Sequence, residues 1–347
     1  MKTKKILFLQ YILPLLTLFL FSLSYCFGSE ESKLEIRSKI NKGISLYKDG
    51  HNNEALPYLM DVIDSGISSS YIHYVVGEIY YSRNELQKAI KNWETSLKYA
   101  PSEAILAKIA KTKKELKLSE KQSDKISCNF VLQYDQDDTY SSELVLHSLV
   151  NEYNHLAYDF GWFNNSDFTV ILYSKEDFTN ILNVPSWAGG IYDGKIRIPF
   201  QYATLNIEDL ESIIRHELTH AILHRIAGNN VPAWLHEGVA QYKDGVDDSA
   251  GRNILKNAVI NNTLIPISNL KNGFVSIKDA ARVKVAYAES LGFVEYLINN
   301  YGFYTILKIL NNFSNYPSLD ELFISVYNLD LGQLESEWIE QLKLENK

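Results

Sequence analysis

Apolar residues recur at helical spacing from residue 35 to residue 118, and several positions recur again after 34 residues. The repeated residues are small, aromatic or bulky apolar, and the matched pairs are Gly43 and Gly77, Tyr47 and Tyr81, Ala55 and Ala89, and Leu59 and Trp93. Small residues at fixed positions allow paired helices to approach closely. PSEAILAKIAKTKKELK, residues 101–117, predicts a closing helix capped by Ser102. The pattern therefore predicts an all-α N-terminal region.

The hydrophobic pattern changes after residue 118. SEKQSDK, residues 119–125, is polar and has no apolar period, so we predict a boundary there. NFVLQY (129–134) and FTVILY (168–173) predict strands, and the amphipathic stretch 141–161 between them predicts a helix. A short helix is expected over 174–182. WAGGIYDGKIRIPF, residues 187–200, predicts a hairpin with its turn at Asp193-Gly194.

After that hairpin the chain has helical patterns to its end. Strands first and helices later indicate an α+β domain over residues 128–347, with a small sheet and a helical C-terminal half. The predicted architecture is therefore an all-α repeat region, 35–118, followed by this α+β domain.

The first 28 residues have the pattern of a signal peptide. Three lysines precede an apolar run from Ile6 to Phe21, and small residues lead to a cleavage site after Gly28. The apolar run is also long enough for an uncleaved membrane anchor. Cys26 offers lipidation as a third reading, although Tyr25 is bulky where a lipoprotein signal has a small residue. In each case the rest of the chain is exported to the periplasm or cell envelope, and only the N-terminal segment contacts the membrane.

Charge and cysteine content narrow the function classes. Removing residues 1–28 changes the net charge from −8 to −11, because that segment carries three lysines and no acidic residue. An acidic exported chain is a poor partner for nucleic acid, so we exclude that class. Cys128 would then be the remaining thiol, which excludes an intrachain disulfide. The fold must therefore be held by its core or by a metal.

The strongest chemical signal is RHELTHAILH, residues 215–224. It lies in a helix expected from about Asn206 to Gly228. His216 and His220 are four residues apart, so both imidazoles leave the same face of that helix. Two imidazoles on one face can hold a metal ion, and Glu217 between them can act as a base.

VPAWLHEGVAQY, residues 231–242, predicts a second helix after a short loop. A short connection makes the two helices antiparallel neighbours and returns Glu237 toward His216 and His220. Catalytic zinc takes three protein ligands, and these three residues satisfy that count. We therefore expect one zinc ion per chain. His236 is the competing ligand, but its side chain points about 100° away on the helix.

HELTH followed by PAWLHEG resembles the gluzincin metallopeptidases, specifically the peptidase MA-like domains of exported bacterial proteins. The resemblance covers residues 128–300 and implies zinc ligands at His216, His220 and Glu237, with Glu217 as the general base. The 34-residue period resembles the tetratricopeptide repeat, which implies protein partners. The pattern departs from M1 aminopeptidases, whose Gly-x-Met-Glu-Asn signature is absent. Gln241 stands where thermolysin-like relatives carry an Asp that orients a ligand histidine.

Other residues near the motifs could be structural or functional. A metzincin would need Gly at position 223 and His at 226, and Leu223 and Ile226 exclude that class. His224 is expected to contact carbonyl groups at the helix end. Tyr287 lies where gluzincins often place a side chain that stabilises an oxyanion, but it is equally a candidate for an aromatic core. Glu289 is expected to be a carboxylate on a helix face, without a catalytic role.

Two functions follow. The first is a zinc-dependent peptidase of the bacterial cell envelope that hydrolyses peptide or protein substrates, with Glu217 and Tyr287 as catalytic residues. The alternative is an envelope scaffold that binds protein partners through residues 35–118 and keeps an inactive peptidase-like domain. The presence of Glu217, which a structural zinc site would not need, favours the enzyme.

Overall fold

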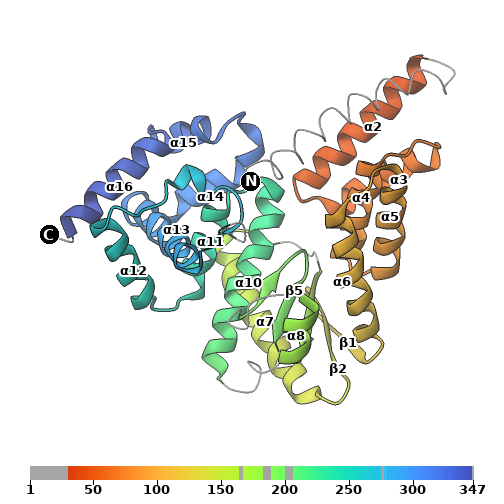
Figure 1. Cartoon of the computed structure of the whole chain (residues 1–347), viewed down its shortest axis with the longest axis horizontal. Helices are drawn as coiled ribbons and strands as arrows, with labels where there is room; N and C mark the ends of the chain where they lie inside the picture. The colour runs from red at the N-terminus through yellow and green to blue at the C-terminus, as the bar shows by residue number, and fades with distance from the viewer. Residues whose placement is uncertain are drawn as a thin grey trace. The chain divides into compact units, whose positions relative to one another are not determined.

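The computed structural model describes residues 30–163, 167–182, 189–199, 206–274, 277 and 279–345. The expected signal peptide, residues 1–28, lies outside these ranges. The chain divides into two compact units, residues 1–120 and 121–347, and each is described by itself (Figure 1). Within the described residues, no helix has the length and apolar character needed to cross a membrane.

The first unit consists of helices in its described part: α2 (Glu30–Lys48), α3 (Asn52–Asp64), α4 (Ser70–Ser82), α5 (Leu86–Tyr99) and α6 (Glu103–Ser119). Helix α2 packs on α3, α4 on α5, and α5 on α6. A Cβ atom at Gly43 would lie 2.8 Å from Leu59 Cδ2, and one at Gly77 would lie 2.4 Å from Trp93 Cδ1. Each helix pair therefore needs a glycine opposite a large buried side chain, and the arrangement recurs after 34 residues.

The second unit contains a small mixed sheet, with strand order β1-β2-β3-β5-β4. Its strands are β1 (Gln122–Ser127), β2 (Phe130–Asp135), β3 (Phe168–Tyr173), β4 (Ile191–Tyr192) and β5 (Ile196–Pro199). The inner pairs β2/β3 and β3/β5 are parallel, and the outer pairs are antiparallel. Helix α7 (Thr139–Phe160) connects β2 to β3, and α8 (Lys175–Leu182) follows β3.

The strands predicted at 129–134 and 168–173 are confirmed, and so is the hairpin over its described residues, 189–199; residues 187, 188 and 200 lie outside the described ranges. Gly194 adopts a φ of 97°, the conformation that its turn requires. The boundary predicted within 119–125 falls where the two units divide, after Glu120, and the same stretch also contains the start of strand β1 at Gln122. This strand pairs along one edge only and its side chains are at most half-buried. Backbone pairing forms it, so it needs no apolar pattern.

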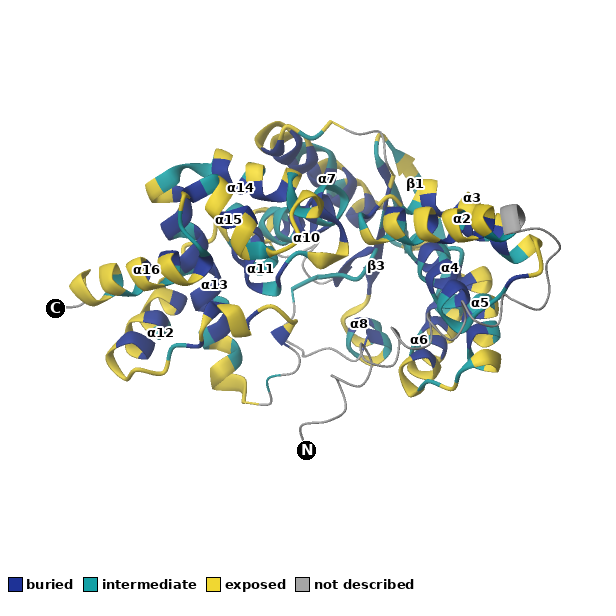
Figure 2. Cartoon of the chain, turned by 90° about the horizontal axis from the view of Figure 1, so that it is seen from above, coloured by how far each residue is buried: buried dark blue, intermediate teal, exposed yellow. Residues whose placement is uncertain are grey.

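The C-terminal half is helical, as expected, and the mixed sheet with these helices fits the α+β class. The helices are α10 (Ile207–Ala227), α11 (Ala233–Asp244), α12 (Ser249–Ile260), α13 (Ala280–Tyr301), α14 (Phe303–Asn311), α15 (Leu319–Tyr327) and α16 (Leu331–Glu345). Short 3-10 turns occur at Gly228–Asn230, Ile267–Asn269 and Phe313–Asn315. Figure 2 shows that α13 is buried over much of its length, whereas α16 is largely exposed.

Helix α10 begins and ends where its sequence predicts. The side chain of Asn206 accepts a hydrogen bond from the Glu208 N–H, and Gly228 ends the helix with a φ of 74°. Apolar residues of α10 enter the core of the second unit, and they include Leu210, Ile214, Leu218, Ala221 and Ile222. That burial fixes the rotation of α10 and thereby the direction of its histidines.

Helix α11 is held between α10 and α13. A Cβ atom at Gly238 would lie 2.2 Å from the backbone oxygen of Ser290, so the two helices approach closely at this point. Trp234 is fully buried, with its ring centre 5.2 Å from that of Phe293. These contacts fix α11, and with it Glu237, relative to α10 and α13.

Candidate metal centre

Helices α10 and α11 bring His216, His220 and Glu237 together in a group that could hold a metal ion. The Nε2 atoms of the two histidines lie 3.2 Å apart. Glu237 Oε2 lies 3.8 Å from Nε2 of His216 and 3.6 Å from Nε2 of His220. The three predicted ligands therefore direct one atom each toward a common point.

These spacings fit zinc. Zinc–nitrogen and zinc–oxygen bonds are about 2.0–2.2 Å long, so tetrahedral coordination places neighbouring ligand atoms about 3.4 Å apart. The observed separations of 3.2, 3.6 and 3.8 Å lie close to that value. Both Nδ1 atoms have hydrogen-bond partners, which leaves the facing Nε2 atoms as the donors for a cation. Two imidazoles and one carboxylate are ligands that zinc uses in proteins.

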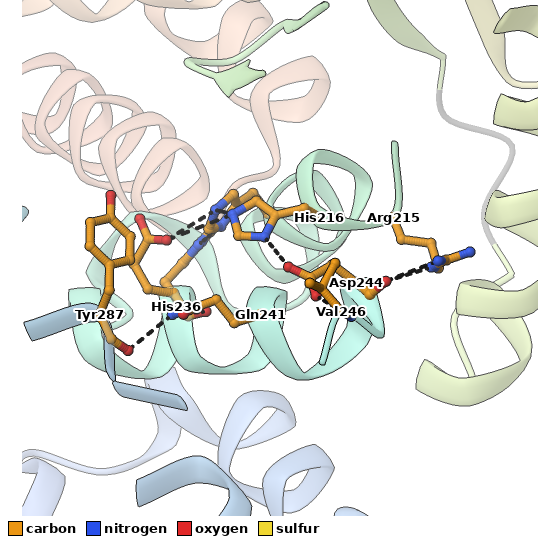
Figure 3. Close-up of polar contacts among 9 residues, drawn as sticks. Arg215, His216, His236, Gln241, Asp244, Val246 and Tyr287 are labelled. Carbon is orange, nitrogen blue, oxygen red and sulfur yellow. Dashed lines mark hydrogen bonds and ion pairs between the residues drawn. The ribbon is translucent and has the colours of Figure 1, made fainter. Parts of the chain in front are cut away.

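Asp244, at the end of α11, orients His216. Its Oδ2 lies 3.1 Å from His216 Nδ1, and its Oδ1 accepts a hydrogen bond from the Val246 N–H. Figure 3 shows Asp244 between His216 and Arg215. The Arg215 guanidinium donates through Nε and Nη2 to the backbone oxygen of Asp244, at 3.2 and 2.9 Å.

The other end of the Arg215 guanidinium contacts Glu152 of α7. Nη1 of Arg215 lies 3.2 Å from Glu152 Oε1, and Glu152 is buried. Asp244 is thus fixed by its backbone and one carboxylate oxygen, while the other oxygen faces His216. A carboxylate on the second ring nitrogen fixes the tautomer of a ligand histidine and increases its basicity.

Charges within the group oppose the effect of burial. Burial by itself lowers the pKa of His216, but the hydrogen bond to Asp244 and the charges of Glu217 and Glu237 outweigh it and raise that pKa to about 9. Burial by itself raises the pKa of Glu237, but His220 and His216 outweigh it and lower that pKa to about 2. Attraction between the histidines and the carboxylates therefore outweighs burial at both His216 and Glu237.

His236 lies beside the group but outside it. Its ring stacks on His220 with centroids 4.7 Å apart, and the two Nδ1 atoms are 2.5 Å apart. Burial and then the charge of His220 lower the pKa of His236 well below its usual value. A neutral His236 can accept the Nδ1–H of His220, which leaves Nε2 of His220 free to bind a metal. The structure therefore places His236 as a partner of His220.

Glu217 is buried next to the two histidines, with 5% of its surface exposed. Its Oε2 has no hydrogen-bond partner among the described residues. Burial raises the pKa of Glu217, and Glu237 and Asp193 raise it further against the opposing effect of the histidines. Gly190, just before β4, approaches so closely that a Cβ atom there would lie 2.7 Å from Glu217 Cγ. The carboxyl group is thus desolvated, and the backbone just before β4 packs against its side chain.

Tyr287 of α13 faces the same site. Burial raises its pKa, and the charges of Glu237 and then Glu217 raise it further. Gln241 links the helices, because its Nε2 donates to the backbone oxygens of Glu237 and Tyr287 at 3.3 and 3.2 Å (Figure 3). Gln241 therefore holds helices together, and the role expected of an Asp at this position belongs to Asp244.

At three residues the structure differs from what the sequence predicts. Asp244 was missed, although it lies seven residues after Glu237 and hence on the same helix face. Glu289, expected as a helix-face carboxylate, is fully buried and accepts a hydrogen bond from the Ile265 N–H at 2.7 Å. His224 contacts the side-chain oxygen of Asn229 at 2.6 Å rather than helix-end backbone carbonyls.

A cavity of about 390 Å³ lies beside the group, and its walls include Tyr192, His220, His236, Glu237, Lys271 and Asn272. The fold and the site together define a protein with a small mixed sheet, a helical half and a two-histidine, one-carboxylate group next to this cavity. Residues 151–344, more than half of the chain, match the Peptidase MA superfamily. The chain belongs to this family. A search of curated proteins finds no match.

Proposed function

We propose that this protein is a zinc-dependent peptidase of the gluzincin type, in which His216, His220 and Glu237 hold the metal. The observation that carries the proposal is the convergence of three ligand atoms at tetrahedral zinc spacing beside a buried carboxylate that does not belong to the ligand set. A structural zinc site needs four protein ligands and no such carboxylate. Membership of the Peptidase MA superfamily supports a peptide or protein substrate.

Zinc held by these residues would polarise the carbonyl of the scissile bond and lower the pKa of water. Asp244 fixes the ring of His216, and His236 fixes that of His220, so both Nε2 atoms keep their direction. The protein therefore orients both ligand rings through their second ring nitrogens.

Glu217 is the proposed general base. It would take a proton from the attacking water and pass it to the nitrogen of the leaving amine. Burial raises its pKa, which makes the ionised carboxylate a stronger base than an exposed one. The free Oε2 is the atom that would carry the proton.

Tyr287 is the proposed electrophile. Its raised pKa keeps the hydroxyl protonated, so it can donate a hydrogen bond to the carbonyl oxygen as negative charge develops there. This role requires the hydroxyl to face the metal ligands. The influence of Glu237 and Glu217 on its pKa supports that position.

The decisive test replaces Glu217 with Gln and Glu208 with Gln in parallel. Glu208 lies on the exposed first turn of the same helix and controls for the loss of one charge from α10. We expect Glu217→Gln to retain about one zinc per chain and to lose about 10²- to 10⁴-fold in peptide hydrolysis. Glu208→Gln should retain both properties, and His220→Ala should lose stoichiometric zinc.

The scaffold alternative makes the opposite prediction. If Glu217→Gln and the wild type act equally on peptides and in cells, the peptidase proposal fails.

We further propose export to the cell envelope and tetratricopeptide-like partner binding by residues 35–118, which the N-terminal sequence and the 34-residue period support. A reporter enzyme fused after Lys347 should be active outside the cytoplasm, and cytoplasmic activity would contradict export.

A further inference from the structure

The cavity of about 390 Å³ that contains His220 and Glu237 in its wall differs in charge from the rest of the chain. The chain has 42 acidic and 34 basic residues. Among the described residues that line this cavity, however, Glu237 is the one carboxylate and Lys271 is the one lysine or arginine. Glu237 is a predicted zinc ligand, so the metal would offset its charge. The cavity of the zinc-loaded protein would therefore offer net positive charge to a ligand.

Two further residues of the wall carry neutral hydrogen-bond donors. Asn272 has a side-chain amide, and Tyr192 has a hydroxyl group. Burial raises the pKa of Tyr192 to about 12, so this hydroxyl stays protonated and can donate. An ammonium group together with neutral donors suits an anion that also accepts hydrogen bonds. The anionic group that unmodified peptides carry is the carboxylate.

Backbone hydrogen bonds hold Lys271 next to helix α11. The N–H of Ala233 donates to the backbone oxygen of Lys271 at 3.0 Å, and the next N–H along α11 donates to that of Leu270 at 3.1 Å. Ala233 is the first residue of α11, and Glu237 lies about one helical turn further on. The main chain at Lys271 is therefore fixed relative to a predicted zinc ligand.

Two carboxylates hold the loop that leads to Lys271. Glu289 of α13 accepts a hydrogen bond from the Ile265 N–H at 2.7 Å, and Glu335 of α16 accepts one from the Ile267 N–H at 2.8 Å. The side chain of Ile267 is fully buried in the core of the second unit. The loop is thus fixed to α13 and α16 at its beginning and to α11 at Lys271.

The ammonium group of Lys271 is available to a ligand. The side chain is exposed, and within the described part of the chain no carboxylate forms an ion pair with it. Other lysines of this unit differ, since Lys125 pairs with Glu143 at 3.0 Å and Lys243 pairs with Asp159 at 2.8 Å. An incoming anion would therefore not have to displace a carboxylate of the protein from Lys271.

We propose that this cavity binds a carboxylate group of the substrate and that Lys271 is the residue that determines this specificity. The inference rests on the proposed peptidase function and adds the substrate class, which is peptides with a negative charge close to the scissile bond. The carboxylate has two sources: the C-terminus of the peptide, which would make the protein a carboxypeptidase, or the side chain of Asp or Glu. A charge-assisted hydrogen bond of this kind increases kcat/KM by about 10- to 100-fold over a neutral substrate.

The test uses the full zinc-loaded protein and pairs of peptides that differ in one carboxylate, with cleavage sites read by mass spectrometry. One kind of pair has the same sequence with a free or an amidated C-terminus. The other kind has Glu or Gln at one internal position. We expect kcat/KM to fall by about 10- to 100-fold in one kind of pair when the carboxylate is replaced, and the kind that responds identifies the source.

Three variants test the role of Lys271. Lys271→Glu should reduce the ratio of kcat/KM for the charged over the neutral peptide by at least about 10-fold, whereas Lys271→Arg should keep this ratio. Lys256→Glu is the matched control, because Lys256 is exposed on α12 and does not line the cavity. Lys271 holds α11 through its backbone oxygen, so both variants at this position can keep that contact. Zinc content and a thermal melt check that each variant is folded.

Binding measured without hydrolysis separates this inference from the proposed function. Zinc-loaded Glu217→Gln is titrated with the same peptides in a calorimeter, and the Kd of the charged peptide should be about 10- to 100-fold lower than that of its neutral partner. Addition of Lys271→Glu should remove this difference.

The outcomes decide the two proposals separately. If the wild type cleaves peptides without a preference for a carboxylate, or if Lys271→Glu keeps the wild-type ratio, this inference is wrong and the peptidase function still stands. If the wild type cleaves no peptide but binding of the charged peptide depends on Lys271, the peptidase function fails and the cavity remains a carboxylate-binding site. If neither cleavage nor preferential binding occurs, both proposals fail.

Discussion

Replacement of Asp244 with Asn tests whether this carboxylate prepares His216 to bind zinc. The change keeps the size of the side chain and removes its charge. The Oδ2–Nδ1 contact of 3.1 Å is a charge-assisted hydrogen bond between two half-buried groups, and such bonds contribute about 1.5–3 kcal/mol. Loss of an outer carboxylate partner typically weakens metal binding by about 10- to 100-fold, which corresponds to about 1.4–2.8 kcal/mol. The two estimates agree.

Protons compete with zinc for His216, so the difference in apparent zinc affinity between the two proteins depends on the pH of the assay. Metal binding requires neutral His216, whose pKa in the metal-free protein is about 9. At pH 7 the wild type therefore loses about 100-fold in apparent affinity to proton competition. The Asn variant lacks the charge that raises this pKa, so it loses less. We expect the affinity defect of the variant to be full at about pH 10 and to shrink as the pH falls toward 7.

The assay is competition for zinc with a chromophoric chelator between about pH 7 and pH 10, combined with a thermal melt to confirm folding. Asp247→Asn is the control, because Asp247 is exposed, lies three residues away and carries the same charge. The reasoning is refuted if Asp244→Asn and Asp247→Asn bind zinc equally at about pH 10.

Three further changes test other parts of the site. Tyr287→Phe should lower kcat by about 10²-fold with unchanged zinc content, measured by steady-state kinetics; an unchanged kcat would exclude Tyr287 as an electrophile. Gly238→Ala should destabilise the protein by about 1–3 kcal/mol in urea unfolding, because the new Cβ would meet the backbone of Ser290. Gly332 is exposed on a helix, so Gly332→Ala should be neutral or stabilising. Equal effects of the two changes would refute the close approach of α11 and α13. Burial raises the pKa of Glu289 to about 8, so its carboxyl group binds a proton more tightly in the folded state than in the unfolded state. The free energy of unfolding of the wild type, relative to that of Glu289→Gln, should therefore fall by up to about 1.4 kcal/mol per pH unit from about pH 4.5 to 8. Parallel pH profiles of the two proteins would contradict this.

The sequence by itself determined the elements that carry local signals. Asn206 and Gly228 mark the ends of α10 because capping acts within a few residues. Asp193-Gly194 identifies the hairpin because its turn needs a positive φ. The candidate ligands could be predicted for the same reason: His216 and His220 share one helix face, and a short loop returns the next helix beside them.

Tertiary structure decided what depends on contacts between distant segments. Strand β1 carries polar residues and forms by pairing with β2, so no apolar pattern revealed it. The contact between Asp244 and His216 depends on the relative rotation of α10 and α11, which core packing sets. Glu289 looks like a surface carboxylate in sequence, yet its place in the core depends on a loop that donates the Ile265 N–H. An apolar stripe predicts the main buried face of a helix, but whether a polar residue such as Glu289 is also covered depends on the neighbouring segments.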